Sequence, residues 1–364
     1  MQRLCHVIFL LVVAFVLSPW TAAQDSAATS ADAVLDRISS HLDKSTIFVG
    51  YFDLKNVDPE KSVASLREIV DDSLKKSTMP KEIKDMIQPM FAQGFDALEK
   101  ELKEGQQGEA WRQFRSSGCE AVYMLVNSMT MAQCPARILC VLDPSTETAT
   151  IDAVQKILET NAPTARFRHK DGLIVGDFFP PGLTDELRQA AEKALAAFDK
   201  SRKPTTRPEL LAGMERAKSA PFKLVFAPDA ALKGMIQMFY PMAPPELQEA
   251  LPAKTILAGA HWISLGIDIN RWIIDLNIKG ESPEAAQTLY DAVIKFKDAS
   301  LAPMADQAKT LDEQIMPFIP KVQEDRLRLT INRKFLDDHL SNIIQYALPA
   351  IMAAQQGMPL VPQP

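Results

Sequence analysis

The fold is decided by the stretch ISLGIDINRWIIDLNI, residues Ile263–Ile278. Its first half alternates isoleucine or leucine with small or polar residues, which is the pattern of a half-buried strand. With a two-residue turn at Asn270 and Arg271, three apolar pairs form on one face of the hairpin: Ile267 with Ile274, Leu265 with Leu276, and Ile263 with Ile278. Because a slip of one residue sets isoleucine against aspartate and asparagine, the sequence predicts the register as well as the hairpin.

A helix follows this hairpin, and the same unit occurs earlier in the chain. Ser282 and Pro283 are an N-cap and a first-turn proline. Upstream, the predicted strands Cys119–Asn127 and Ala136–Leu142 precede an apolar stripe at helical spacing. One further strand lies before and one after each copy: Thr46–Phe52 and Leu173–Val175 for the first, Phe222–Phe226 and Leu327–Ile331 for the second. Each half reads β-α-β-β-α-β with a terminal helix. We therefore predict an α+β fold of two tandem ferredoxin-like halves with antiparallel sheets and inserted helices.

The predicted domain organisation follows from these two copies. We expect a signal peptide at 1–23, a disordered mature N-terminus at 24–31, a first half at 32–200, a charged and proline-rich linker at 201–208, a second half at 209–354, and a disordered tail at 355–364. The strands of the second half alternate, so we expect its polar face to be wet. Those of the first half are apolar on both faces, so we expect cover on both and packing of the two halves through this sheet.

The first 23 residues have the three parts of a secretory signal peptide. Arg3 precedes an apolar run from Val7 to Leu17, and Thr21 and Ala23 supply the small residues of a cleavage site. This run is shorter than the roughly 20 residues that span a bilayer, and we predict no transmembrane segment after its removal. The predicted location is secreted or periplasmic.

The overall composition excludes some classes of partner. The chain of 364 residues is 47% apolar and 24% charged, with a formal net charge of −6, as in a globular acidic protein. An acidic chain disfavours nucleic acid, which demands a basic surface. Three cysteines follow the predicted signal peptide, Cys119, Cys134 and Cys140; their number is odd and they match no zinc spacing, so they are core residues or form one incidental bridge.

No motif for catalysis, metal binding or a cofactor stands out. Four histidines follow the predicted signal, and His169, among charged residues in an expected turn, is the best candidate of them; a charged hairpin tip explains it equally well. Ser73 and Lys76 form a Ser-x-x-Lys string without its companion elements. We predict no catalytic residues, no metal site and no cofactor.

Two groups of residues are candidates for binding. Methionine and aromatic side chains adapt to irregular apolar ligands, so a ligand pocket is one interpretation of Met235, Met238, Phe239 and Met242, and a core helix ended by prolines is the other. Trp262 and Trp272 bracket the hairpin, where they cap the core or anchor an interface.

Three classes of function remain open. The sequence favours an exported, non-catalytic binding or scaffold protein of the cell envelope or extracellular space, with an unknown protein or apolar ligand as partner. The first alternative is a carrier of an apolar small molecule or lipid. The second is a hydrolase with an unrecognised site, since catalytic groups can come together only in space.

Overall fold

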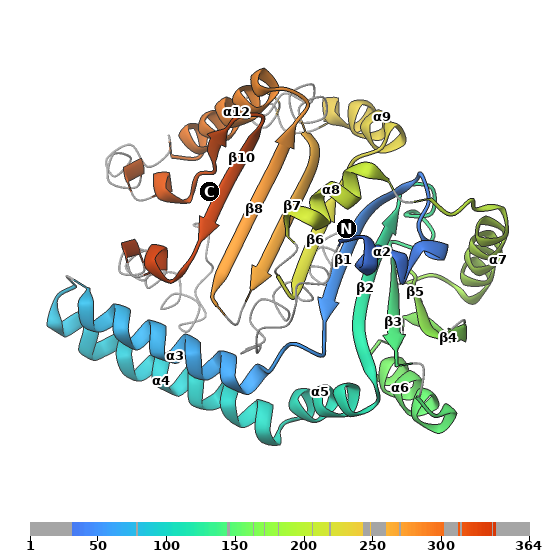
Figure 1. Ribbon diagram of the computed structural model, residues 1–364, viewed down its shortest axis with the longest axis horizontal. Helices are drawn as coiled ribbons and strands as arrows, with labels where there is room; N and C mark the ends of the chain where they lie inside the picture. The colour runs from blue at the N-terminus through green and yellow to red at the C-terminus, as the bar shows by residue number, and fades with distance from the viewer. Residues whose placement is uncertain are drawn as a thin grey trace.

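We describe the protein from a computed structural model covering residues 31–339, apart from 78, 144–145, 163, 171, 181, 206, 218–219, 243–247, 249–259, 269–270, 302–311, 314 and 337. The predicted signal peptide at 1–23, nearly all of the predicted disordered N-terminus at 24–31 and the tail at 355–364 lie outside the described residues. The fold is α+β, with a ten-stranded antiparallel sheet in the order β4-β5-β3-β2-β1-β6-β7-β8-β10-β9 (Figure 1). Its strands are β1 (Thr46–Asp53), β2 (Cys119–Asn127), β3 (Ala136–Leu142), β4 (Ala165–Lys170), β5 (Leu173–Phe178), β6 (Phe222–Phe226), β7 (Ala260–Asp268), β8 (Ile273–Gly280), β9 (Lys321–Gln323) and β10 (Arg326–Ile331).

The strand order repeats from one half to the other. Starting from the centre, β1-β2-β3-β5-β4 and β6-β7-β8-β10-β9 run outward in matching order, and β1 pairs with β6 across the middle. This order does not confirm ferredoxin-like halves. In that fold the first strand lies between two strands of its own half, whereas β1 has β2 on one side and β6 of the other half on the other.

The register predicted for the decisive hairpin is confirmed. Ile263 opposes Ile278, Leu265 opposes Leu276, and pairing ends where Asp268 meets Ile273. The predicted turn includes Asn270, which lies outside the described residues. Two edge strands were not predicted: β4 lies in a segment interpreted as a turn, and β9 begins where a predicted helical insertion ends, at about Lys321.

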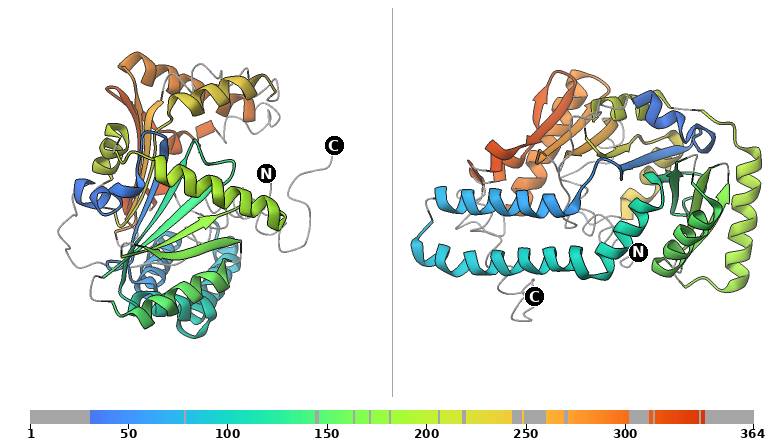
Figure 2. Two further views of the ribbon diagram at one scale, coloured as in Figure 1. Left: turned by 90° about the vertical axis from the view of Figure 1, so that its right-hand side faces the viewer. Right: turned by 60° about the horizontal axis from the view of Figure 1, so that its bottom comes forward.

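Helices lie on both sides of the sheet. Figure 2 shows α2 and α8 on one side, and α5, α6, α9 and α12 on the other. Side chains at N-caps explain several helix starts: Asp58, Thr184 and Asp229 each accept a hydrogen bond from a backbone N–H in the first turn. The helices are α2 (Ala31–Asp36), α3 (Pro59–Lys76), α4 (Lys81–Glu104), α5 (Gln106–Ser116), α6 (Thr148–Asn161), α7 (Asp185–Ser201), α8 (Pro208–Arg216), α9 (Ala230–Phe239) and α12 (Pro283–Leu301), with 3-10 turns η1 (Ser39–His41), η2 (Tyr240–Met242) and η4 (Met316–Phe318).

The main hydrophobic core lies between the sheet and the helices α2 and α8. It includes Val49, Tyr123, Leu210, Met214 and Trp262, and therefore draws residues from both halves. We call this side of the sheet the α8 face and the opposite side the α12 face. None of the described helices is long and apolar enough to cross a membrane.

The segment predicted as the linker is tied to the centre of the sheet. Arg202 donates a hydrogen bond of 2.7 Å from Nη1 to the carbonyl of His41, and Arg207 donates bonds of 3.1 and 2.8 Å from Nη1 to the carbonyls of Thr46 and Ala227. These bonds fix the chain between α7 and α8 at the place where β1 meets β6.

Candidate functional site

Three rows of apolar side chains cross the α12 face of the sheet. Residues directly opposite each other in an antiparallel pair point to the same side, so the register identifies each row. The middle row runs over seven strands and includes one glycine: Ile138, Met124, Gly50, Leu224, Leu265, Leu276 and Leu329. The first row is Val126, Phe48, Phe226, Ile263, Ile278, Leu327 and Val322, and the third is Cys140, Val122, Phe52, Phe222, Ile267, Ile274 and Ile331.

Helices cover the two ends of this face. At one end, Leu289 of α12 packs against Leu327, Ile278 and Val322. At the other, Ile151 and Val154 of α6 and Phe114 of α5 pack in a cluster with Phe52 and Cys140. Figure 2 shows the middle of the α12 face between these two groups of helices.

The middle of the α12 face is only half-buried. No hydrophobic cluster of the described residues includes its side chains, and each of them has intermediate exposure: Phe48, Met124, Val126, Leu224, Phe226, Ile263, Leu265, Ile267, Ile274, Leu276, Leu329 and Ile331. We call this set the apolar floor. Because contiguous apolar side chains with this exposure are a feature of interaction sites, the apolar floor is the first candidate site.

The polar face of the second half is buried at β7, whereas Arg328 and Thr330 of β10 are half-exposed. Ser264 is 0% exposed and Asn277 is 1% exposed, although both alternate with the floor residues. The expectation that the polar face of this half is wet therefore holds at β10 and is wrong at β7. The physical reason is α8, which crosses β6 and β7 so closely that a Cβ on Gly266 would lie 3.1 Å from the Cβ of Ala217.

Burial on the α8 face lowers the pKa of one lysine. Lys223 is 2% exposed, and its Nζ lies 4.9 Å from the centre of the Tyr51 ring. Burial lowers the pKa of Lys223 to about 8, against the opposing effect of Asp53 and Glu215. This face is packed and offers no open surface at Lys223.

The predicted binding residues lie in two places, the methionines and Phe239 on α9 and η2 and the two tryptophans at the β7–β8 hairpin. Met238 and Met242 are 70% and 81% exposed, and Met235 has intermediate exposure, whereas the side chain of Phe239 lies outside the described residues. Trp262 is buried in the main core and so presents no surface anchor. Trp272 is half-buried, with a positive φ of 52° and a buried Nε1 that has no hydrogen-bond partner. A ligand role for the methionines stays a prediction.

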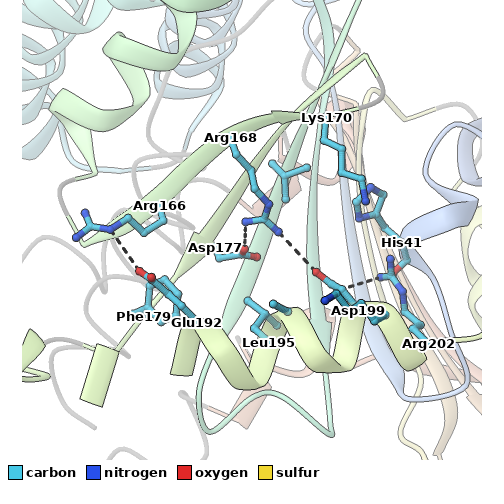
Figure 3. A pocket seen from close by; sticks show the side chains of 13 residues that line it. His41, Arg166, Arg168, Lys170, Asp177, Phe179, Glu192, Leu195, Asp199 and Arg202 are labelled. Carbon is cyan, nitrogen blue, oxygen red and sulfur yellow. Dashed lines mark hydrogen bonds and ion pairs between the residues drawn. The ribbon is translucent and has the colours of Figure 1, made fainter. Parts of the chain in front are cut away.

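A second candidate site, which is charged, lies on the α8 face at the edge of the sheet formed by β4 and β5. Arg137 of β3 donates from Nε to Asp177 at 2.6 Å, and from both terminal nitrogens to Asp199 of α7 at 2.8 and 2.9 Å. Arg168 of β4 also pairs with Asp177 and reaches Asp199 at 3.6 Å. This network attaches α7 to the sheet beside a pocket of about 580 Å³ (Figure 3).

The pKa values of Asp199 and His41, which line this pocket, are shifted from their usual ranges. Burial raises the pKa of Asp199, but the hydrogen bonds and charges of Arg137, Arg202 and Arg168 outweigh it, and the pKa lies below its usual range. Burial, with the charges of Arg202 and Arg137, lowers the pKa of His41 to about 4. His41 is therefore neutral at pH 7, and its Nδ1 is buried without a hydrogen-bond partner.

Among the described residues no metal-binding group is present, and the serine of the Ser-x-x-Lys string is buried. The described residues hold no group of three or more histidine, cysteine or acidic side chains placed to bind a metal. Ser73 is 3% exposed on α3, so its hydroxyl is not an accessible nucleophile. His169 lies on the edge strand β4, not in the expected turn.

The three cysteines within the described residues are free thiols with low reactivity. Cys119, Cys134 and Cys140 are all buried, and burial beside Asp177 raises the pKa of Cys134 to about 12. We expect iodoacetamide at pH 8 to leave all three unmodified in the folded protein and to alkylate them in urea, as read by peptide mass spectrometry. Alkylation of Cys134 at equal rates with and without urea would contradict this placement.

Neither the apolar floor nor the charged pocket emerged from the sequence as a site. The floor residues were predicted as strand residues, but their exposure depends on which face α8 covers. Arg166, Arg168 and Lys170 were assigned to a charged turn, and their spacing of two residues was the signal for a strand with all three on one face.

Comparison with known proteins gives no family. No family model matches the chain, and no curated protein matches it. Two solved structures of TP0453, crystal forms I and III, are similar over 84% and 83% of this chain and 97% of theirs, with 11% and 9% identity. The TM-score is 0.34 for both, so this similarity carries no argument about function.

Proposed function

We propose that this chain is a non-catalytic binding protein of the cell envelope or extracellular space that holds an apolar small molecule or lipid chain on the apolar floor. The observation that carries the proposal is the half-exposure of aligned apolar rows on one face while polar side chains of the same strands are buried on the other. Export is part of the proposal and depends on the signal-like residues 1–23.

The chemistry of the floor fits a chain-like apolar ligand. Its residues are almost all aliphatic, with Phe48 and Phe226 in one row and the adaptable thioether of Met124 in the next. Residues along one row belong to neighbouring strands about 4.8 Å apart, so an extended alkyl chain lying across the strands contacts several strands at once. Each buried methylene of such a ligand contributes about 0.8 kcal/mol.

The position of the floor favours a small ligand over a folded protein partner. Helices α5 and α6 stand at one end of this face and α9 and α12 at the other (Figure 2). A flat protein surface meets these helices before it reaches the strands, whereas an alkyl chain lies between them. The protein-scaffold alternative has no comparable observation in its favour.

A titration with the neutral fluorophore N-phenylnaphthylamine tests the proposal. We expect saturable binding to the full-length chain, weakened about 10-fold in Leu265→Gln and Leu276→Gln, because each places an amide at the centre of the middle row. Far-ultraviolet circular dichroism confirms that these variants fold.

The matched control is Leu187→Gln on α7, since Leu187 is 57% exposed and lies outside the apolar floor. It makes the same chemical change and should alter the dissociation constant less than 2-fold. Absence of saturable binding by the wild-type chain, or equal weakening by Leu187→Gln and Leu265→Gln, would overturn the proposal.

A further inference from the structure

The three most exposed large apolar side chains among the described residues are methionines. Met242, Met238 and Met129 are 81%, 70% and 65% exposed. Met238 lies on α9, Met242 follows on η2, and Met129 lies on the loop after β2. Scattered exposed apolar residues are normal on a protein surface, so these three are informative only because their two segments adjoin each other.

The loop after β2 and the start of α9 meet at one edge of the sheet. Because β2 and β6 both pair antiparallel with β1, they run in the same direction, and Val126 and Phe226 near their ends both oppose Phe48 in the first row of the apolar floor. Just beyond them, Ser128 donates a hydrogen bond of 2.5 Å from Oγ to Oδ2 of Asp229, the N-cap of α9. Figure 1 shows α9 on the opposite side of the molecule from α3 and α4. Both segments therefore leave the sheet next to the first row of the floor.

These two segments carry no charge. We call residues 128–133 and 234–242 the methionine edge; neither contains an acidic or basic residue, in a chain that is 24% charged. The one charged residue of α9, Lys233, forms an ion pair of 3.4 Å with Glu281. A helix with so few polar side chains is normally buried in a protein core or in lipid, yet Met238 is exposed. The composition of this edge thus fits an apolar partner that the chain itself does not supply at Met238.

A lipid surface fits the methionine edge better than a folded protein does. Two short segments supply fewer residues than the roughly 20–30 per side of a standard protein interface. Shallow insertion into a bilayer needs only one layer of apolar side chains, about 5–10 Å deep. The unbranched methionine side chain adapts to a fluid partner, and an uncharged edge avoids the cost of burying a charge against zwitterionic headgroups.

We propose that the methionine edge docks the chain on the surface of a zwitterionic lipid bilayer, with Met129, Met238 and Met242 inserted among the headgroups. This inference rests on the proposed function, because docking places the first row of the apolar floor beside the membrane. A lipid chain then passes from the bilayer to the floor without crossing water. The exchange of one apolar environment for another requires no source of energy.

Oxidation of the full-length chain by hydrogen peroxide, with and without phosphatidylcholine vesicles, tests the docking when it is mapped by peptide mass spectrometry. Conversion of methionine to the sulfoxide follows exposure to water, so we expect vesicles to slow it at least about 5-fold at Met129, Met238 and Met242. Met86, which is 41% exposed on α4, is the internal control and should be slowed less than about 2-fold. Because the readout belongs to single residues, it locates the contact even if the apolar run at 7–17 also binds lipid.

A double variant separates insertion of the methionine edge from binding elsewhere. Met238→Gln with Met242→Gln replaces two apolar side chains by amides, and should reduce the protection of Met129 to less than about 2-fold. The matched double variant, Met86→Gln with Leu187→Gln, makes the same kind of change at exposed positions of α4 and α7, and Met129 should stay protected. Far-ultraviolet circular dichroism confirms that both variants fold.

Three results overturn the docking. The first is equal protection of Met86 and Met129, and the second is no protection of Met129, Met238 and Met242 at up to about 5 mM lipid. The third is protection that rises with protein concentration in the absence of vesicles, because it shows that a second copy of the chain covers the edge.

The fluorophore N-phenylnaphthylamine, used without lipid, keeps this test separate from that of the apolar floor. The Met238→Gln, Met242→Gln variant should bind it as the wild type does. Weaker binding by this variant would place the methionines in the ligand site and overturn the docking. Failure of the wild type to bind the fluorophore, with protection by vesicles intact, overturns the apolar floor and supports the docking.

Discussion

Replacing Arg137 with leucine lowers the free energy of unfolding by about 3–5 kcal/mol, because the carboxylates of Asp177 and Asp199 between the sheet and α7 lose their main partner. The Arg137 side chain is 8% exposed, and that of Asp177 is 2% exposed. Removing one member of such a buried network costs more than the network contributes, since the remaining charge stays desolvated. Urea denaturation followed by circular dichroism measures this change. A loss below about 1 kcal/mol would contradict the described burial.

The loss in Arg137→Leu depends on pH in a direction set by Asp199. Arg137 helps to hold the pKa of Asp199 below its unfolded value of about 3.9, so this carboxylate stabilises the fold above that pH. This stabilisation is lost as the pH falls through the pKa that Asp199 has in the folded protein. The difference between wild type and Arg137→Leu should therefore be greatest at pH 7 and shrink below pH 4. Arg137→Lys keeps the charge but not the paired hydrogen bonds, so its free energy of unfolding should lie between those of the wild type and Arg137→Leu.

Placing a side chain at Gly213 should destabilise the packing of α8 on the centre of the sheet. A Cβ there would lie 2.4 Å from Cγ1 of Val225 on β6, which is closer than real contacts allow. Val225 is 0% exposed and belongs to the main core, so it has no room to move away. We expect Gly213→Ala to lower the free energy of unfolding by about 1–3 kcal/mol, as measured by thermal and urea denaturation.

A double-mutant cycle separates this clash from a general effect of Gly213 on α8. Val225→Ala alone should destabilise by leaving a cavity, but in the Gly213→Ala background it also removes the clash. Its cost should therefore be smaller in that background. Equal costs in both backgrounds would show that Gly213 and Val225 do not contact each other.

Sequence patterns predicted the local elements of this fold well because strand alternation and turns are encoded locally. The register of β7 and β8 follows from pairing isoleucine and leucine across the hairpin, and the structure confirms it. The order of strands was not accessible in this way. Whether β1 pairs inside its own half or with β6 depends on contacts between segments about 170 residues apart, and the local pattern is the same in either case.

The faces of the sheet show a second limit. Alternation in Ile263–Ile267 predicts that one face is more apolar, but it does not say which face a helix covers. Here α8 packs on small and polar residues such as Gly266 and Ser264, because their small size permits close approach. The apolar residues between them are left half-exposed. The most informative surface of the molecule is thus one that a standard amphipathic interpretation assigns to the core.

The charged pocket was missed for a different reason. Arg137 and Asp177 occur in strands that read as apolar, and Asp199 lies in a helix that reads as a surface helix. Only the pairing of β3 with β5 places Arg137 opposite Asp177. Because the network is assembled from three separate elements, its residues have no recognisable spacing pattern in the sequence.

Photo-crosslinking tests the binding role of the apolar floor most directly. A neutral monoacylglycerol with a diazirine in its acyl chain is irradiated with the full-length chain, and the labelled residues are mapped by peptide mass spectrometry. We predict labels concentrated on β6, β7, β8 and β10 at floor residues such as Leu224, Leu265 and Leu276, and competed by excess unlabelled lipid. Labels confined to exposed positions such as Leu187 and Met129, or unaffected by competitor, would contradict it.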